Sequence, residues 1–372
     1  MVLCRVSWAL ALLTVAAASP VTKIQKRGLP DFVRQYAPVA YLHSQEVYFP
    51  SSIAGQLIHT HPVDDTGADI TTSAPLTLDN LDTLNAFANG GQDVYLTSNE
   101  GIQALPAWFQ GTKPSPSGST GSTMASVIVT VAKPDDVLDA FYFSFYAYNQ
   151  GNAVLGLPAL LEFGDHVGDW EHTMLRFVNG TPQAMWFSQH SSGQAFTYAA
   201  VEKYVTGSAA DGAGGGEVGL RPVVYVAKGS HANYATPGSH DHTIPGLSLP
   251  DGPLEDHTDA GIFWDPLLPD VYEYDWDAST GVFTAYDNTG ASSSPTTTTT
   301  AATTAAWLAF LGRWGDAQLP DDADGQVDVF GQRKYTAGPT GPVDKDLGRQ
   351  AVCPGDDDDD DGDCMVRTVL TV

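Results

Sequence analysis

The run FYFSFYAY, from Phe141 to Tyr148, decides the fold class of this chain. Phe141, Phe143 and Phe145 occupy alternate positions, so in extended backbone their rings point to one face of a strand. Alternation of this kind with high aromatic content is typical of a β-strand. Similar β-branched or aromatic stretches occupy residues 126–132, 170–178, 183–188, 222–227 and 271–276.

Turn-forming residues separate these stretches, since the 372 residues include 37 Gly and 24 Pro. Helical patterns are few: one over 53–59, capped by Ser51 or Ser52, and one over 305–314. We therefore predict an all-β fold, an antiparallel β-sandwich or jelly-roll-like single large domain with a few short helices.

The charge of the chain excludes one large class of partner. It carries 44 Asp and Glu against 17 Lys and Arg, a formal net charge of −27. A surface this negative repels phosphate backbones, so we expect no nucleic-acid binding.

The N-terminus predicts entry into the secretory pathway. An apolar stretch from Trp8 to Ala18 after Arg5 predicts a signal peptide over residues 1–18. Residues 19–27 then read as a propeptide ending in the dibasic pair Lys26-Arg27. No later segment is apolar for long enough to cross a bilayer, so we predict no transmembrane segment. We expect an extracellular protein, with the vacuole as the alternative destination.

The main domain is expected over residues 28–350, with a Ser/Thr-rich surface loop at 292–304. An acidic tail follows at 351–372, in which Cys353 and Cys364 are expected to form a disulfide around an Asp run. Asn179, in Asn-Gly-Thr, is the predicted N-glycosylation site.

The segment GDHVGDWEH, Gly164–His172, is the densest cluster of chemically active residues. Asp169 and Glu171 are two residues apart and share one face of a strand, and His166 precedes them across a Val-Gly turn. These three side chains predict a site for a divalent cation: Ca²⁺ or Mg²⁺ for oxygen ligands, with Mn²⁺ or Zn²⁺ possible for a mixed set. Two alternatives stay open: a general acid and base, or a buried polar cluster beside Trp170.

Three further histidines are candidates for catalysis: His172, His190 and His231. The sequence has no Gly-x-Ser-x-Gly elbow, so the serines beside His190 and His231 are not favoured as nucleophiles. Whether the protein is an enzyme is left open at this level, with a non-enzymatic role favoured.

The chain resembles the Vps62 family (vacuolar protein sorting-associated protein 62), found in fungi and related to a plant family of unknown function. The resemblance spans about residues 31–348 and implies a β-rich domain with a link to vacuolar protein sorting. The segments that carry it are 36–43 (YAPVAYLH), 164–172 with Leu175-Arg176, 186–193 (WFSQHSSG), 224–234, and 312–315 (GRWG).

A more distant resemblance concerns the necrosis-inducing NLP proteins, whose Gly-His-Arg-His-Asp-Trp-Glu motif helps to bind a divalent cation. Its first His, Asp and Glu fall on His166, Asp169 and Glu171, which implies the same cation site. The chain departs from that family's pattern at Asp165, Val167, Gly168 and, upstream, Pro158.

The sequence thus favours a non-enzymatic secretory-pathway protein in which a cation organises a surface for a protein or glycan partner. A metal-dependent extracellular hydrolase and an NLP-like effector that binds membranes or glycans are the alternatives. The sequence does not decide the oligomeric state.

Overall fold

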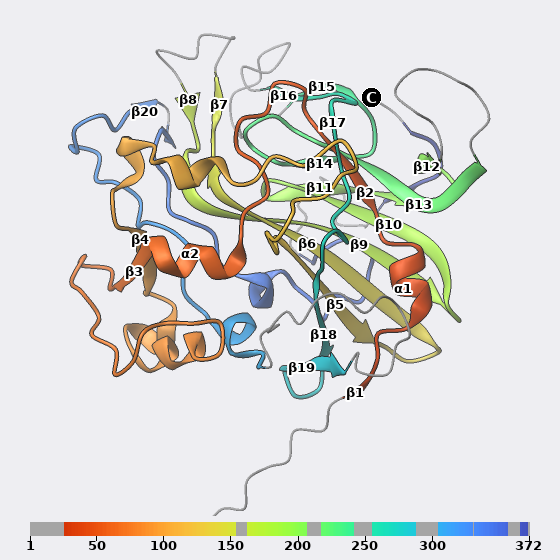
Figure 1. Cartoon of the computed structure of the whole chain (residues 1–372), viewed down its shortest axis with the longest axis horizontal. Helices are drawn as coiled ribbons and strands as arrows, with labels where there is room; N and C mark the ends of the chain where they lie inside the picture. The colour runs from red at the N-terminus through yellow and green to blue at the C-terminus, as the bar shows by residue number, and fades with distance from the viewer. Residues whose placement is uncertain are drawn as a thin grey trace, which may run out of the picture.

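The structure is a computed structural model that describes residues 26–153, 162–206, 217–241, 255–287, 304–329, 331–355 and 365–370. Strands dominate it, which confirms the predicted fold class (Figure 1). The two α-helices are short: α1 at Asp31–Gln35 and α2 at Ile53–His59, where the Ser52 hydroxyl accepts a hydrogen bond from the Gly55 N–H at 3.0 Å. The helix predicted over 305–314 is a 3₁₀ turn at Ala306–Ala309. Other 3₁₀ turns lie at Leu81–Ala86, Asn89–Gly91, Ile102–Ala104, Ala107–Gln110 and Pro342–Asp344.

A nine-stranded sheet, here called the large sheet, forms the centre of the molecule in the order β1-β19-β18-β5-β6-β9-β10-β11-β22. Its middle strands β5, β6, β9, β10 and β11 are antiparallel, as predicted. Their bounds are β5 Ser126–Ala132, β6 Val137–Asn149, β9 His166–Val178, β10 Thr181–Gln189 and β11 Ser192–Thr197. The outer strands are β1 Lys26–Arg27, β18 Tyr272–Asp277, β19 Val282–Asp287 and β22 Val366–Arg367.

A five-stranded small sheet has the order β12-β13-β2-β17, with β14 paired to β13. Its bounds are β2 Val39–Leu42, β12 Lys203–Thr206, β13 Glu217–Val226, β14 Asn233–Tyr234 and β17 Ile262–Trp264. Four two-stranded ribbons complete the fold: β3 Thr60–Val63 with β4 Tyr95–Ser98, β7 Asn152–Ala153 with β8 Glu162–Phe163, β15 Gly238–Asp241 with β16 Glu255–Thr258, and β20 Asp328–Val329 with β21 Gln332–Arg333.

Four strand pairs are parallel, and each joins segments far apart in sequence: β1 with β19, β5 with β18, β11 with β22, and β2 with β13. The predicted antiparallel arrangement therefore holds for the consecutive middle strands but not for these added ones. Parallel neighbours need long connections, and residue alternation along one strand carries no information about them.

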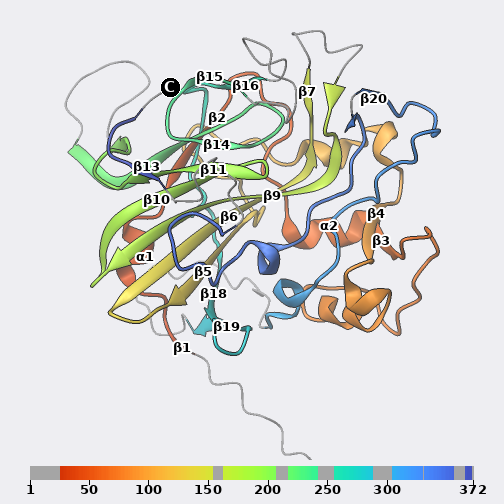
Figure 2. The same ribbon diagram turned by 180° about the vertical axis from the view of Figure 1, so that it is seen from behind.

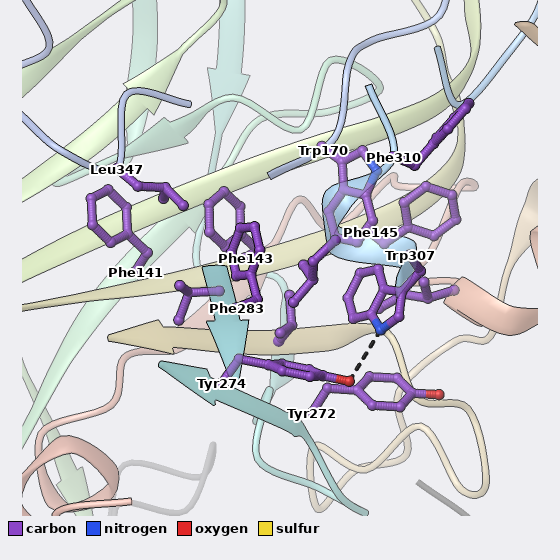
Figure 3. Close-up of a cluster of buried hydrophobic side chains, with 14 of the residues drawn as sticks. Phe141, Phe143, Phe145, Trp170, Tyr272, Tyr274, Phe283, Trp307, Phe310 and Leu347 are labelled. Carbon is purple, nitrogen blue, oxygen red and sulfur yellow. Dashed lines mark hydrogen bonds between the residues drawn. The ribbon is translucent and has the colours of Figure 1, made fainter. Parts of the chain in front are cut away.

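The large sheet is buried on both faces. On one face, Phe141, Phe143 and Phe145 pack with Trp170 and Trp307, and the Trp307 indole N–H donates to the Tyr274 hydroxyl at 3.1 Å (Figure 3). Other strands of the large sheet and segments from both ends of the chain outside it, within 53–96 and 307–353, supply the rest of this core. Burial of both faces explains why the middle strands carry few charged residues.

The small sheet and α1 cover the opposite face of the large sheet. Tyr142, Tyr146 and Leu175 of the large sheet pack there against Val224 and Trp264 of the small sheet. In both views α1 and α2 lie toward opposite sides of the molecule (Figures 1 and 2).

A buried ion cluster attaches the C-terminal segment to the large sheet. Asp139, which is fully buried, lies 2.7 Å from both Lys133 Nζ and Arg176 Nε. Arg176 also donates to the carbonyl oxygens of Gln350 and Ala351, at 2.8 and 3.0 Å. The chain is therefore held against the sheet where the predicted acidic tail begins.

Several sequence predictions concern residues that the structure does not describe. The signal peptide, most of the propeptide, most of the 292–304 loop and Cys364 lie outside the described residues. Cys353 is buried and disulfide-bonded, but its pairing with Cys364 stays a prediction. Asn179 is exposed in the turn between β9 and β10, where glycosylation also stays a prediction. Among the helices of the described residues, none is long and apolar enough to span a membrane.

Candidate functional site: an acid–histidine cluster between the sheets

Strand β9 presents Asp169 and Glu171 to the side of the large sheet that faces the small sheet. Their neighbours on β6 are Tyr146, opposite Asp169, and Ser144, opposite Glu171. Both carboxylates are nearly buried, with Asp169 4% and Glu171 8% exposed. The chain reaches this position through Gly168, whose φ of +67° favours glycine and whose missing Cβ leaves room for the backbone carbonyl of Trp314.

Asp169 is paired with a histidine from the small sheet side. Its Oδ2 lies 2.9 Å from Nδ1 of His231, whose Nε2 lies 2.9 Å from the carbonyl oxygen of Tyr48. The His231 ring stacks on Tyr146 with centroids 3.7 Å apart and is fully buried. The Tyr48 carbonyl oxygen only accepts, so Nε2 carries a proton, and Nδ1 donates to Asp169 when the ring carries a second proton and a positive charge.

The electrostatics around His231 agree with that geometry. Burial lowers the pKa of His231, but the hydrogen bond to Asp169 and the charges of Glu46 and Asp169 outweigh burial, so the pKa is raised. The carboxylates next to His231 thus stabilise the positively charged form of its ring in the interior.

Glu171 lies beside this pair and has polar neighbours of its own. Its Oε2 accepts from the Ser188 hydroxyl at 3.0 Å, and the Asn233 amide nitrogen approaches at 3.5 Å. Burial and the negative charge of Asp169 raise the pKa of Glu171 well above its usual range. This carboxyl therefore holds a proton more readily than an exposed glutamate does.

Asp256 organises a second acid–histidine pair that the sequence reading missed. It is fully buried and accepts from the Ser230 hydroxyl at 2.6 Å, the Tyr234 hydroxyl at 2.7 Å and Nε2 of His190 at 2.7 Å. His190 stands at the turn between β10 and β11 with φ of +55°, and its side chain is 27% exposed. Burial lowers the pKa of His190, but the charge of Asp256 and the hydrogen bond to it outweigh this effect, so the pKa is raised overall.

Glu46 is a further buried carboxylate near this cluster that sequence reasoning missed. Its Oε1 accepts from the backbone N–H groups of Val47 and Tyr48, and its Oε2 from that of Gly229, each at 2.8 Å. It ties the loop after β2 to the turn that carries His231. The only sequence signal for Glu46 was its place just after the segment 36–43.

His166 and His172 are placed differently from the other candidates. His166 Nδ1 lies 2.6 Å from the carbonyl oxygen of Gly168 on its own strand, and burial lowers its pKa. His172 points to the opposite face of the large sheet, where it stacks on Phe143 and its Nε2 lies 3.3 Å from Arg349 Nη2. Burial and the charge of Arg349 lower the pKa of His172 well below its usual value.

The structure thus brings Asp169, Glu171 and His231 into one cluster, and it leaves His172 on the other side of the sheet. The sequence already indicated that His172 lies on the other face from Glu171, because adjacent residues in a strand face opposite ways. Among the described residues, no group of three or more His, Cys, Asp or Glu side chains has an arrangement that could hold a metal ion.

Comparison with known proteins places the chain in a family. The family model described as vacuolar protein sorting-associated protein 62 matches residues 112–246. A Saccharomyces cerevisiae protein named putative vacuolar protein sorting-associated protein TDA6 is 36% identical over 340 residues, which cover 88% of this chain and 69% of that protein. The chain belongs to the Vps62 family. The S. cerevisiae protein named vacuolar protein sorting-associated protein 62 is 32% identical over 339 residues, covering 88% of this chain and 68% of its own length.

Solved structures give only a weak likeness to this Vps62-family chain. Necrosis and Ethylene inducing Protein 2, from the causal agent of cocoa's Witches Broom disease, matches with a TM-score of 0.26 and 11% identity, over 58% of this chain and 72% of that one. The non-toxic HaNLP3 protein matches with a TM-score of 0.27 and 13% identity, over 67% of this chain and 77% of that one. TM-scores this low do not establish a common fold.

Proposed function

We propose that this Vps62-family protein is a non-enzymatic binding protein of the secretory pathway that takes part in vacuolar protein sorting. Its family membership and the names of its two yeast relatives support the sorting role. One observation carries the non-enzymatic part: the hydroxyls of Ser188 and Ser230 donate to the carboxylates of Glu171 and Asp256. A serine nucleophile instead donates to an imidazole that removes its proton.

The buried cluster then has a structural role in binding. Contacts of Asp169 with His231 and of Asp256 with His190 link segments next to the small sheet to β9 and to the end of β10, and Glu46 links the loop after β2 to Gly229. Because every one of these links crosses between segments distant in sequence, the cluster holds the loops at this end of the sheets in one arrangement. A partner, whether protein or glycan, would meet preformed loops.

The finer part of the proposal is a divalent cation on Asp169 and Glu171, with His166 as a third ligand. The two carboxylates fit a hard cation such as Ca²⁺ or Mg²⁺, because they share one face of β9 and because burial, together with the charge of Asp169, raises the pKa of Glu171, a cost that a bound cation would offset. His166 fits less directly, since its Nδ1 already contacts a carbonyl oxygen and only Nε2 would remain for a metal. Binding of Mn²⁺ or Zn²⁺ would require Nε2 of His166 as a ligand.

Metal content tests the cation. The purified protein, the double variant Asp169→Asn/Glu171→Gln and the control Asp82→Asn, an exposed aspartate, would be dialysed against trace metal and measured by elemental analysis. About one metal ion per chain in wild type and control, lost in the double variant, would support the site. Equal metal in all three proteins would refute it and assign any binding to the acidic surface.

Sorting is tested separately. In S. cerevisiae lacking both relatives, we expect a vacuolar protease to leak into the medium and this chain to restore its retention. A tagged copy would show whether the protein stays in the vacuolar route or leaves the cell. Failure to restore retention, with the folded protein present, would contradict the sorting proposal.

The second candidate is a hydrolase, and the His190–Asp256 pair favours it. A partly exposed imidazole whose Nε2 lies 2.7 Å from a buried carboxylate is the arrangement of a general base. Aryl esters, phosphoesters and polysaccharides would be assayed with and without chelator, using His190→Gln as the matched variant. Turnover that disappears in His190→Gln would replace the binding proposal with this one.

A further inference from the structure

The small sheet carries an aromatic cluster on its face away from the large sheet. Side chains alternate along its strands: Ala40 and Val224 point toward the large sheet, whereas Tyr41 and Tyr225, one residue further on, point away from it. Phe263 pairs with Tyr41 on the neighbouring strand β17. Three aromatic residues therefore lie in a row across β13, β2 and β17.

A fourth ring and one carboxylate complete the cluster. Tyr204, on β12, stacks on Phe263 with centroids 5.0 Å apart and an interplanar angle of 16°. Tyr41 stacks on Tyr225 at 5.9 Å and 20°, and it is tilted by 58° to Phe263, so the two stacked pairs do not form one flat layer. The Tyr225 hydroxyl donates to Oε2 of Glu202 at 2.7 Å, which holds the carboxylate beside the rings.

The cluster is partly open to solvent. Tyr41, Tyr204 and Phe263 are part-exposed, and Glu202 is exposed. The pKa of Tyr41 is raised by burial first and then by Tyr204 and the charge of Glu202, which agrees with the close approach of these groups. Rings and a carboxylate that water reaches are also within reach of a small dissolved molecule.

No Lys, Arg or His side chain in the described part of the chain forms an ion pair with Glu202. Lys203, its neighbour in sequence, instead places its Nζ over the Tyr198 ring, 4.0 Å from the centroid, and Arg221 is paired with Asp265 at 2.6 Å. Glu202 therefore presents a negative charge that these residues leave uncompensated, in a chain whose net charge of −27 already attracts cations.

We propose that this cluster binds a small organic cation with a methylated ammonium group. Such a charge is attracted both to the faces of aromatic rings and to a carboxylate. Methyl groups on the nitrogen add apolar surface that packs against the rings, and they reduce the hydration that a bare ammonium would lose. The site is separate from the acid–histidine cluster, which lies between the sheets, and does not depend on the sorting role.

Glu100 provides a matched control. It is also exposed, and its Oε2 accepts from an aromatic residue, the indole N–H of Trp108, at 3.1 Å. It lies outside the small sheet, so Glu100→Gln removes an exposed charge of the same kind and leaves the proposed site intact.

The test measures choline affinity by saturation-transfer NMR, and follows contact with the site through the ring signals of Tyr41, assigned with Tyr41→Phe. Choline should shift these signals saturably, and Tyr41→Phe, which keeps the ring, should bind it about as well as wild type. Glu202→Gln and Tyr41→Leu should each weaken binding roughly two- to fivefold, the scale of one exposed charge pair or one cation–π contact. The uncharged isostere 3,3-dimethyl-1-butanol, with carbon in place of the nitrogen, should bind at least about fivefold more weakly than choline.

Three results would overturn the proposal: no saturable shift at Tyr41, equal choline affinity in wild type and Glu202→Gln, or equal affinity of choline and its isostere. A loss in Glu100→Gln as large as that in Glu202→Gln would also overturn it, because the negative surface as a whole would then bind choline. Glutamine keeps an acceptor for the Tyr225 hydroxyl, so Glu202→Gln should fold, and the comparison of choline with its isostere needs no variant.

Discussion

The substitution Asp169→Asn should destabilise the folded protein, because it leaves the buried imidazolium of His231 without its counter-charge. His231 is fully buried and Asp169 is 4% exposed, so water cannot replace the lost carboxylate. Removing one partner of a buried ion pair costs about 3–5 kcal/mol. Against a typical stability of about 5–15 kcal/mol, that is a large loss.

The loss should depend on pH. His231 has a raised pKa, so the pair contributes stability that is fully present below the unfolded pKa of about 6.5 and is lost as pH rises through the folded pKa. In Asp169→Asn, the neutral ring can keep its hydrogen bond to the Tyr48 carbonyl by donating from Nε2. The variant should therefore lose about 3–5 kcal/mol at pH 5, but only about 1.5–3 kcal/mol, the value of one charged hydrogen bond, at pH 9.

Urea unfolding at both pH values, in chelator to remove any bound metal, measures these differences. A double-mutant cycle with His231→Asn isolates the pair, because asparagine tolerates the φ of +57° at that position. We expect a coupling energy of at least about 2 kcal/mol at pH 5, since removing both charges leaves no buried charge unpaired.

Asp321→Asn is the matched control. Asp321 lies 2.7 Å from Arg333, but its side chain is 62% exposed, so water screens the pair and its loss should change stability far less than the loss of Asp169. Equal losses in Asp169→Asn and Asp321→Asn, or additive losses in the cycle, would refute a buried ion pair at His231.

Three further outcomes follow from the same geometry. The pKa of His190 is raised, so its pairing with Asp256 stabilises the fold below pH about 6.5, and this contribution is lost as pH rises through the folded pKa. His190→Gln should therefore lower the melting temperature more at pH 5.5 than at pH 9. An equal decrease at both pH values would contradict the pairing. Gly168→Ala should lower the free energy of unfolding in urea by at least about 2 kcal/mol, because it adds a Cβ against the Trp314 carbonyl at positive φ. A change under about 0.5 kcal/mol, typical of a neutral surface substitution, would be inconsistent with this close approach. Asp139→Asn should lower the free energy of unfolding by about 3–5 kcal/mol, because it removes the counter-charge of Lys133 and Arg176. It should also speed proteolysis near residues 350–353. Unchanged proteolysis would show that other contacts hold the C-terminal segment.

Local sequence determined the strands and the orientation of side chains within them. Alternation over Phe141–Tyr148 predicted β6, and the spacing of Asp169 and Glu171 placed both on one face of β9. Ser52 was one of two predicted caps of α2, and its hydroxyl makes the capping bond. These features depend on contacts within a few residues, which the period of a strand or the first turn of a helix already specifies.

Only the tertiary structure decided which polar groups meet. Asp169 and His231 are 62 residues apart, and His190 and Asp256 are 66 apart. Asp256 and Glu46 have no local motif that marks them as buried, and hydrogen-bond donors make their burial tolerable. Ser230, Tyr234 and His190 surround Asp256, and the distant Gly229 N–H joins two adjacent backbone N–H groups at Glu46. Those partners come together when the small sheet packs on the large one, and no residue spacing along the chain encodes that packing. The sequence by itself determined a β-rich Vps62-family chain with paired carboxylates, while long-range packing decided that His231 contacts Asp169 and that Ser188 and Asn233 contact Glu171.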